Sequence, residues 1–181
     1  MDGNAKQGFR SPEQSDVSRQ QLELYLYDPQ YLDDLLEFTL PPEQHRFTAL
    51  PAEVLSISLR DPERHPIVMV VNGRAVGFFV LHEGDGIITY QSYTDTPPDQ
   101  LMLLRALLVD SSEQGHGYSK QAMNRLGELV RNQFPHIREV ILAVNELNER
   151  ACQVYLATGF EDRDIRRQGA LGLQRILHYL I

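Results

Sequence analysis

The chain has 181 residues, and its 17 Lys+Arg against 25 Asp+Glu leave a formal net charge of −8. This length suits a single domain, and hydrophobic and charged fractions of 42% and 23% are ordinary for a globular protein. The acidic excess argues against nucleic acid as a partner, because a nucleic-acid-binding protein needs a basic face to displace counterions.

Further classes are excluded by what the sequence lacks. A single cysteine, Cys152, rules out an intrachain disulfide and a cysteine metal cluster, and the histidines form no metal-ligand pattern, so no metal is expected. No apolar run approaches ~18 residues, so we expect no membrane-spanning segment and no membrane partner. The N-terminus has no apolar core of the kind found in secretory signals, which favours a cytoplasmic protein.

The charge is unevenly distributed along the chain. Residues 1–104 hold 16 acidic and 7 basic residues, whereas residues 105–181 hold 9 acidic and 10 basic ones. One interpretation is a solvated acidic surface in the first half. The other is that the two halves meet different partners, one cationic and one anionic.

The first half combines short helices with a hairpin. Residues 1–20 are polar and predict a loosely ordered arm, which leaves 21–181 as the single domain. Asp28-Pro29 can open a helix, and Asn72-Gly73 is a strong signal for a two-residue hairpin turn. The expected elements are a strand at 22–26, helices at 29–40 and 51–59, paired strands at 67–71 and 75–81, and a further strand at 87–90.

The second half alternates strands with helices. Residues 101–109 form an almost continuous apolar run broken by Arg105, which predicts a strand buried on both faces. A helix over 122–134, a strand over 140–144, a helix from Asn148 to Gly159 and a strand over 175–180 follow. The fold class is therefore α/β, a mixed sheet with a βαβ unit in the C-terminal half.

A glycine-containing loop joins the strand at 101–109 to the next helix, and it reads Gln114-Gly115-His116-Gly117-Tyr118-Ser119-Lys120. Glycines let backbone amides turn toward a ligand, and a helix start presents unpaired N–H groups that favour phosphates. The loop is neither a Walker loop nor a complete dinucleotide fingerprint. Taken by itself it is equally consistent with a tight turn that binds nothing.

Two motifs in order give the loop its context. Gln114-x-x-Gly117-x-Ser119 is followed by Asn148, Ala151, Tyr155 and Gly159-Phe160 in an Asn-x-x-Ala-x-x-x-Tyr-x-x-x-Gly-Phe spacing. Over about residues 101–160 the chain resembles the GNAT superfamily of acyl-CoA-dependent N-acetyltransferases. Ser119 departs from the family's Gly or Ala, a small change that should preserve phosphate binding. The resemblance implies a mostly antiparallel sheet with helices on both faces.

The resemblance also implies a set of site residues for acetyl-CoA. The backbone of Leu107, Leu108 and Val109 would pair with the pantetheine arm, with the Val109 amide as an oxyanion donor. Asn148 would contact the arm, a role compatible with capping its helix, and Tyr155 would protonate the departing thiolate, although spacing by itself favours a core aromatic. The residues implied for the pyrophosphate are Gln114, Gly115, His116, Gly117, Tyr118, Ser119 and Lys120.

The general base is left open, since the strand before the loop lacks the glutamate that the family often has there. His82, Glu83, Tyr90 or a water relay could serve, and none has a spacing argument. Arg105 is either a paired structural charge or a substrate or cofactor contact. A nucleophilic role for Cys152 is not expected, because direct transfer needs no acyl-enzyme.

We therefore predict acetyl transfer from acetyl-CoA to a primary amine of a small molecule, with a softer resemblance to bacterial enzymes that act on polyamines. The acidic first half would then attract a cationic amine. A homodimer is compatible with this prediction. A protein or peptide N-acetyltransferase and a catalytically silent CoA-binding regulatory module stay open as alternatives.

Overall fold

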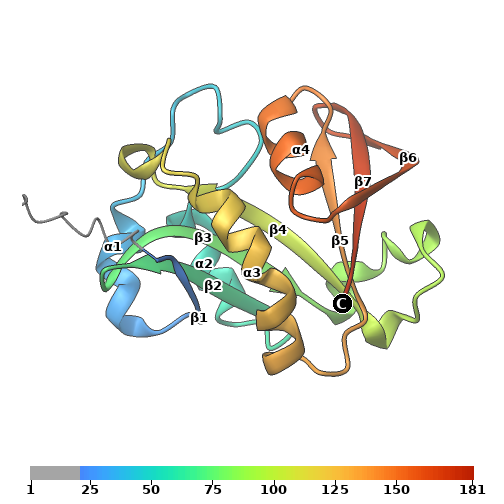
Figure 1. The fold of residues 1–181 in the computed structure, drawn as a ribbon, viewed down its shortest axis with the longest axis horizontal. Coiled ribbons are helices and arrows are strands. Elements are labelled where there is room, and N and C mark those ends of the chain that lie inside the picture. The colour runs from blue at the N-terminus through green and yellow to red at the C-terminus, as the bar shows by residue number, and fades with distance from the viewer. Residues whose placement is uncertain (1–20) are drawn as a thin grey trace, which may run out of the picture.

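The structure is a computed structural model that describes residues 21–181. The predicted arm at 1–20 lies outside the described residues. A seven-stranded sheet forms the centre of the fold, in the order β1-β2-β3-β4-β5-β7-β6 (Figure 1). Its strands are β1 (Glu23–Leu26), β2 (Arg64–Val71), β3 (Arg74–His82), β4 (Leu101–Val109), β5 (Glu139–Asn145), β6 (Glu161–Gly169) and β7 (Gly172–Leu180).

Helices cover both faces of this sheet, as the family resemblance implied. The helices are α1 (Leu32–Leu36), α2 (Pro51–Ser58), α3 (Tyr118–Gln133) and α4 (Glu149–Leu156). Leu126 of α3 packs with Phe79 and Leu81 of β3 on one face, while Leu55 of α2 packs with Phe78 of β3 on the other. Successive strand residues point to opposite faces, so one apolar strand supplies both cores.

The hairpin between β2 and β3 forms as the sequence predicted. Asn72 and Gly73 have φ angles of 51° and 79°, the left-handed conformation that a two-residue turn of this kind requires. The helix expected over 29–40 is shorter, a 3₁₀ turn at Pro29–Tyr31 followed by α1.

The βαβ unit is β4-α3-β5, and β4 and β5 are paired in parallel. Their pairing covers only Leu101–Leu103 of β4 against Glu139–Ile141 of β5. Beyond Leu103 the two strands separate, and β4 is exposed or partly exposed from Arg105 to Leu107. The prediction of a strand buried on both faces therefore fails in the middle of β4. Its backbone groups there have no neighbouring strand on the β5 side, which leaves them available to a ligand.

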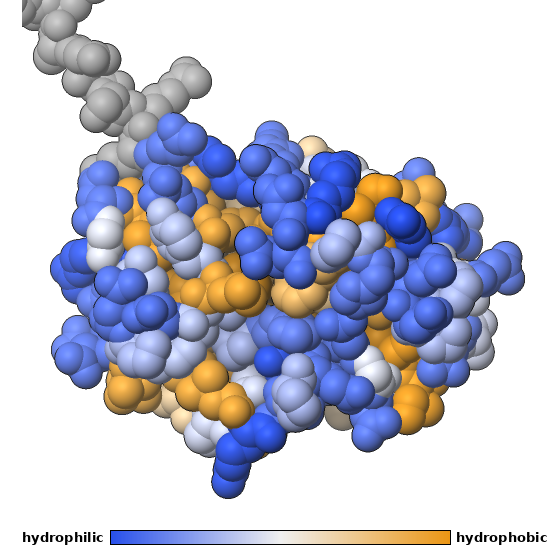
Figure 2. All heavy atoms as spheres, turned by 90° about the horizontal axis from the view of Figure 1, so that it is seen from below, coloured by the Kyte–Doolittle hydropathy of each residue, from blue (hydrophilic) through white to orange (hydrophobic). Residues whose placement is uncertain are grey.

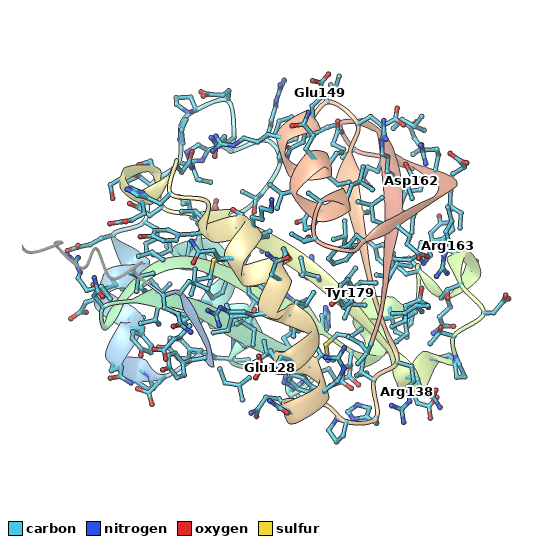
Figure 3. All side chains as sticks on the ribbon, viewed as in Figure 1. Glu128, Arg138, Glu149, Asp162, Arg163 and Tyr179 are labelled. Atoms are coloured by element: carbon cyan, nitrogen blue, oxygen red, sulfur yellow. The ribbon has the colours of Figure 1, made fainter. Side chains whose placement is uncertain are left out.

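One prediction from local pattern was wrong, and one strand was not predicted. Residues 87–90, expected as a strand, lie in a 3₁₀ turn (Gly84–Ile87) and the turn that follows it. This segment folds onto His82, so closely that a Cβ on Gly86 would lie 2.3 Å from the imidazole. β6 was not predicted, because its charged sequence has no apolar alternation; Asp162 and Arg163, labelled in Figure 3, belong to this edge strand.

The surface is consistent with a chain of ordinary composition. The face in Figure 2 is mostly hydrophilic, with hydrophobic side chains showing between the polar ones. Among residues 21–181, no helix has both the length and the apolar character needed to cross a membrane.

Candidate active site

The gap between β4 and β5 opens into a cavity of about 530 Å³. Its wall contains β4, β5, the start of α3, α4 and the segment 43–48 that precedes α2. His116 is the one predicted site residue absent from the wall. The predicted residues that line the cavity are Leu107, Leu108, Val109, Gln114, Gly115, Gly117, Tyr118, Ser119, Lys120, Asn148 and Tyr155.

A bulge in β4 shapes one side of the cavity. Val80 of β3 faces Arg105 and Phe78 faces Leu108, so the single residue between them on β3 opposes two residues on β4. Ala106 absorbs the extra residue with a φ of 56°, a conformation that costs a non-glycine residue energy. Such bulges leave backbone groups outside the strand ladder. At the Ala106 bulge these are backbone groups of β4, which lines the cavity.

The loop between β4 and α3 uses its glycines for backbone conformation. Gly115 and Gly117 have φ angles of 91° and 74°, and a Cβ added to either would meet no atom within 4 Å. The requirement is therefore for left-handed backbone rather than for space. Gly117 is the N-cap of the 16-residue helix α3, so the helix N-terminus is presented at the cavity with Lys120 in its first turn. This end of the cavity suits an anion such as a phosphate.

Gln114 connects this loop to the segment before α2. Its side-chain amide donates to the Val109 carbonyl at 3.1 Å and exchanges two 3.0 Å hydrogen bonds with the amide of Gln44. The Gln44 contact joins residues 70 positions apart and brings segment 43–48 over the cavity. His116 instead stacks on Tyr118 at the surface, with ring centroids 5.3 Å apart. His116 is therefore a loop residue in this structure, outside the cavity wall.

Helix α4 carries the two downstream residues. The Asn148 side chain accepts a hydrogen bond from the Ala151 amide at 3.3 Å, so it caps the helix while also lining the cavity. Tyr155 is buried and packs edge-on against Phe160 at 5.2 Å. Burial raises the pKa of Tyr155 well above its usual value of 10, and Cys152 adds to this. Tyr155 is therefore protonated at neutral pH, and it is a weaker acid than an exposed tyrosine.

Cys152 lies nearby but is not part of the cavity wall. It is buried, its thiol is 3.8 Å from the Asn145 carbonyl, and burial raises its pKa. A thiol in this state is a poor nucleophile.

The far side of the cavity is less acidic than the sequence led us to expect. Of the first-half acids within residues 21–104, only Glu43 lines the cavity, and Arg46 lies close to it in the same segment. The potential bases His82, Glu83 and Tyr90 do not line the cavity wall. His82 is buried, and Glu83 is occupied by His65 at 2.8 Å and His136 at 2.5 Å.

Several cavity residues were not predicted from the sequence. Gln44 and Arg46 belong to a segment without a motif, and Arg150 and Gln174 lie on α4 and β7 without a distinguishing pattern. Arg105, which interrupts an apolar strand and was left open as either a paired structural charge or a substrate or cofactor contact, does line the cavity.

Comparison with known proteins places the chain in a family. The Acetyltransferase (GNAT) family matches residues 29–160. A relative from Bacillus subtilis (strain 168), described as the uncharacterized N-acetyltransferase YbbJ, is 42% identical over 162 residues, which cover 90% of this chain and 99% of that protein. The chain therefore belongs to the GNAT acetyltransferase family, and the predicted class, an acetyl-CoA-dependent N-acetyltransferase, is confirmed.

Solved structures agree on the fold. The aminoglycoside acetyltransferase AAC(6')-Ib, in complex with paromomycin and acetyl-CoA, superposes with a TM-score of 0.66 at 20% identity, covering 88% of this chain and 93% of that one. The spermidine N-acetyltransferase of Vibrio cholerae, in complex with CoA and spermine, has the same TM-score at 15% identity and covers 88% and 95%. At identities of 20% and 15%, this likeness shows a shared fold and nothing about the substrate.

Proposed function

We propose that this enzyme transfers the acetyl group of acetyl-CoA to a primary amine of a small molecule by direct attack on the thioester. The observation that supports the proposal is the cavity in the gap between β4 and β5, with the glycine-containing loop and the start of α3 at one end and Tyr155 in its wall. Two neighbours of the same fold were solved with small amines, an aminoglycoside and spermine.

The cosubstrate would lie along the exposed middle of β4. Its pyrophosphate would take the amides from Gly115 to Ser119 at the start of α3, with Lys120 and Arg150 supplying positive charge. Its pantetheine arm would pair with the backbone of Leu107 to Val109 as an additional strand, and Asn148 would hold the arm from α4. We place the pyrophosphate at the glycine loop because this loop is the part of the wall best suited to an anion.

The chemistry then needs four events. The amine loses a proton, its lone pair attacks the carbonyl carbon, and a tetrahedral oxyanion forms that backbone N–H groups stabilise. The Val109 amide and the amides at the Ala106 bulge are the donors we propose. The C–S bond then breaks and the CoA thiolate takes the proton of Tyr155, while the second proton of the attacking nitrogen is released through solvent and the tyrosinate is reprotonated, leaving a neutral amide, free CoA and tyrosine. No acyl-enzyme is involved, in keeping with the inert surroundings of Cys152.

The test is acetyl-CoA binding followed by a panel of amines. Acetyl-CoA should raise the melting temperature, because a ligand of the native state stabilises it. Amines are then screened for CoA release and for the acetylated product by mass spectrometry. Binding without turnover of any amine or peptide would favour the regulatory-module alternative, and turnover of peptides over every small amine would favour a protein acetyltransferase.

A further inference from the structure

Arg105 presents an uncompensated positive charge to the cavity. Arg105 is an exposed residue that lines the cavity, and within residues 21–181 it forms no ion pair. Arg105 lies opposite Val80, whose side chain belongs to the core of the α1–α2 face, so Arg105 points to that face. Tyr155 packs in the core of the opposite, α3–α4 face. Arg105 and Tyr155 therefore lie on opposite faces of the sheet.

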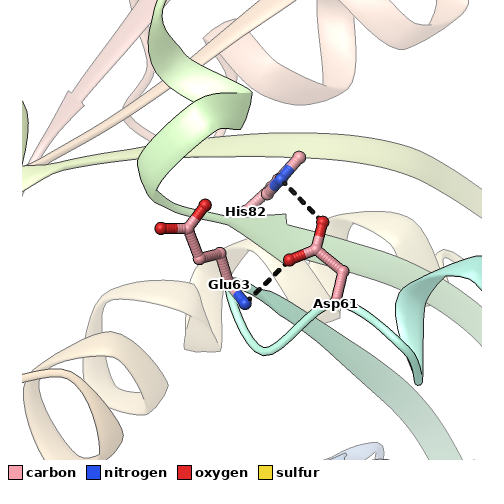
Figure 4. Close-up of side chains that lie close together, drawn as sticks. All are labelled: Asp61, Glu63 and His82. Carbon is pink, nitrogen blue, oxygen red and sulfur yellow. Dashed lines mark hydrogen bonds and ion pairs between the residues drawn. The ribbon is translucent and has the colours of Figure 1, made fainter.

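The guanidinium is held in place by a buried imidazole. Arg105 Nη1 lies 3.3 Å from His82 Nδ1, and because arginine can only donate, Nδ1 must accept. The proton of His82 is then on Nε2, which is buried and lies 3.6 Å from Asp61 Oδ2 (Figure 4). Asp61 is itself fixed by the Glu63 amide and by Arg64 Nε, each at 3.0 Å.

In this arrangement Asp61, Glu63 and His82 do not form a cation site. Asp61, Glu63 and His82 lie close enough together to suggest a cation site, with possible ligand atoms within 4.8 Å of one another. Nε2 of His82, which faces Asp61, carries the proton in this arrangement, however, and a protonated nitrogen has no lone pair for a metal. Burial lowers the pKa of His82, and Arg64 and Arg105 lower it further, so the ring is neutral and can accept from Arg105.

We infer that Arg105 binds an anionic group of the acceptor, so that the substrate is an amine that also carries a carboxylate or a phosphate. This inference rests on the proposed function and narrows its substrate class. A guanidinium that is always charged and offers a fork of N–H donors is well matched to either anion.

The cavity wall offers a cationic acceptor no excess of negative charge. Lys120 and Arg150 are assigned to the pyrophosphate, and the remaining charged residues are Arg46 and Arg105 against Glu43 and Glu113, although the whole chain is acidic. A polyamine would meet Arg105 with like charge, which is unfavourable in a partly enclosed site. An amine that also carries a carboxylate would supply Arg105 with a counter-ion.

The experiment compares acceptors that differ only in the anion. The pairs are L-lysine against cadaverine and phosphoethanolamine against ethanolamine, each assayed for kcat/KM with acetyl-CoA. We expect the anionic member of at least one pair to be preferred at least tenfold, and the preferred pair identifies carboxylate or phosphate. Arg105→Gln should remove the preference by raising KM for that member at least tenfold, and Arg105→Lys should restore part of it.

A matched control and a binding measurement complete the test. Arg60→Gln removes the same charge at an exposed position outside the cavity and should leave the preference intact. Calorimetric titration of the same acceptors into CoA-saturated protein reports the anion site without turnover. The inference is overturned if cationic members react or bind as well as anionic ones, if Arg105→Gln leaves the preference unchanged, or if no anionic member binds. Binding of anionic members without acetylation of any amine would instead count against the proposed function.

Discussion

A buried carboxylate at the base of the β4–β5 gap offers the sharpest stability test. Glu139 is fully buried at the start of β5 and accepts hydrogen bonds from His178 at 2.7 Å, from Thr94 at 2.5 Å and from Thr96. Burial acts to raise the pKa of Glu139, but these hydrogen bonds outweigh it and lower the pKa from 4.5 to about 2. The network ties β5 to β7 and to the loop before β4.

The size of the effect follows from this pKa difference. At 1.36 kcal/mol per pKa unit, the fall from 4.5 to about 2 corresponds to about 3 kcal/mol of stability. The folded-state pKa is the lower one, so this contribution is fully present above pH 4.5 and is lost as the pH falls toward 2. We expect Glu139→Gln to destabilise the protein by about 3 kcal/mol at pH 7, a large fraction of an ordinary domain's stability.

The assay is urea unfolding followed by circular dichroism, since the chain contains no tryptophan. Curves for the parent and Glu139→Gln are measured at intervals from pH 7 to pH 2, and their difference in unfolding free energy should shrink across the lower half of this range. Glu161→Gln, on exposed β6, makes the same substitution and should have little effect. A difference below ~1 kcal/mol at pH 7, or one that does not change with pH, would refute the reasoning.

Three further predictions concern the proposed site. Tyr155→Phe should lower kcat for acetyl transfer by about 10²-fold or more while acetyl-CoA still raises the melting temperature; unchanged kcat would contradict the proton-donor role. Gly117→Ala forces a Cβ into left-handed backbone, so we expect a loss of about 1 kcal/mol in stability and a higher KM for acetyl-CoA; a KM equal to that of the parent enzyme would argue against the loop as the phosphate site. Cys152→Ala should retain acetyl transfer, and a folded but inactive variant would point to an acyl-enzyme instead.

The parts of the fold that were predicted correctly are those with a strong local signal. The Asn72-Gly73 turn and the glycine loop before α3 depend on backbone conformations that few residues adopt. The 3.6-residue periodicity that predicted α3 reflects burial of one helix face. Gly159, with a φ of 99°, follows α4 as the sequence indicated.

The missed elements lack such a signal. β6 is an exposed edge strand whose charged residues pair with each other, as in the contact between Arg166 and Asp162 at 2.8 Å. Residues 87–90 have the apolar and β-branched composition of a strand, but they pair with no strand of the sheet. The preceding turn instead packs on His82, and Ile87 is buried against Leu101 and Leu103.

The sequence by itself determined the family, the glycine-containing loop before α3 and most of the strands and helices, because each rests on residues close together in the chain. Only the tertiary structure decided how far β4 and β5 stay paired, and that sets where the cavity opens. It also decided the surroundings of Arg105, whose orientation depends on His82 and Asp61 from two other parts of the chain. The acidic composition pointed to a cationic acceptor, yet the cavity wall is basic, because the charges that matter are those the fold brings to one place.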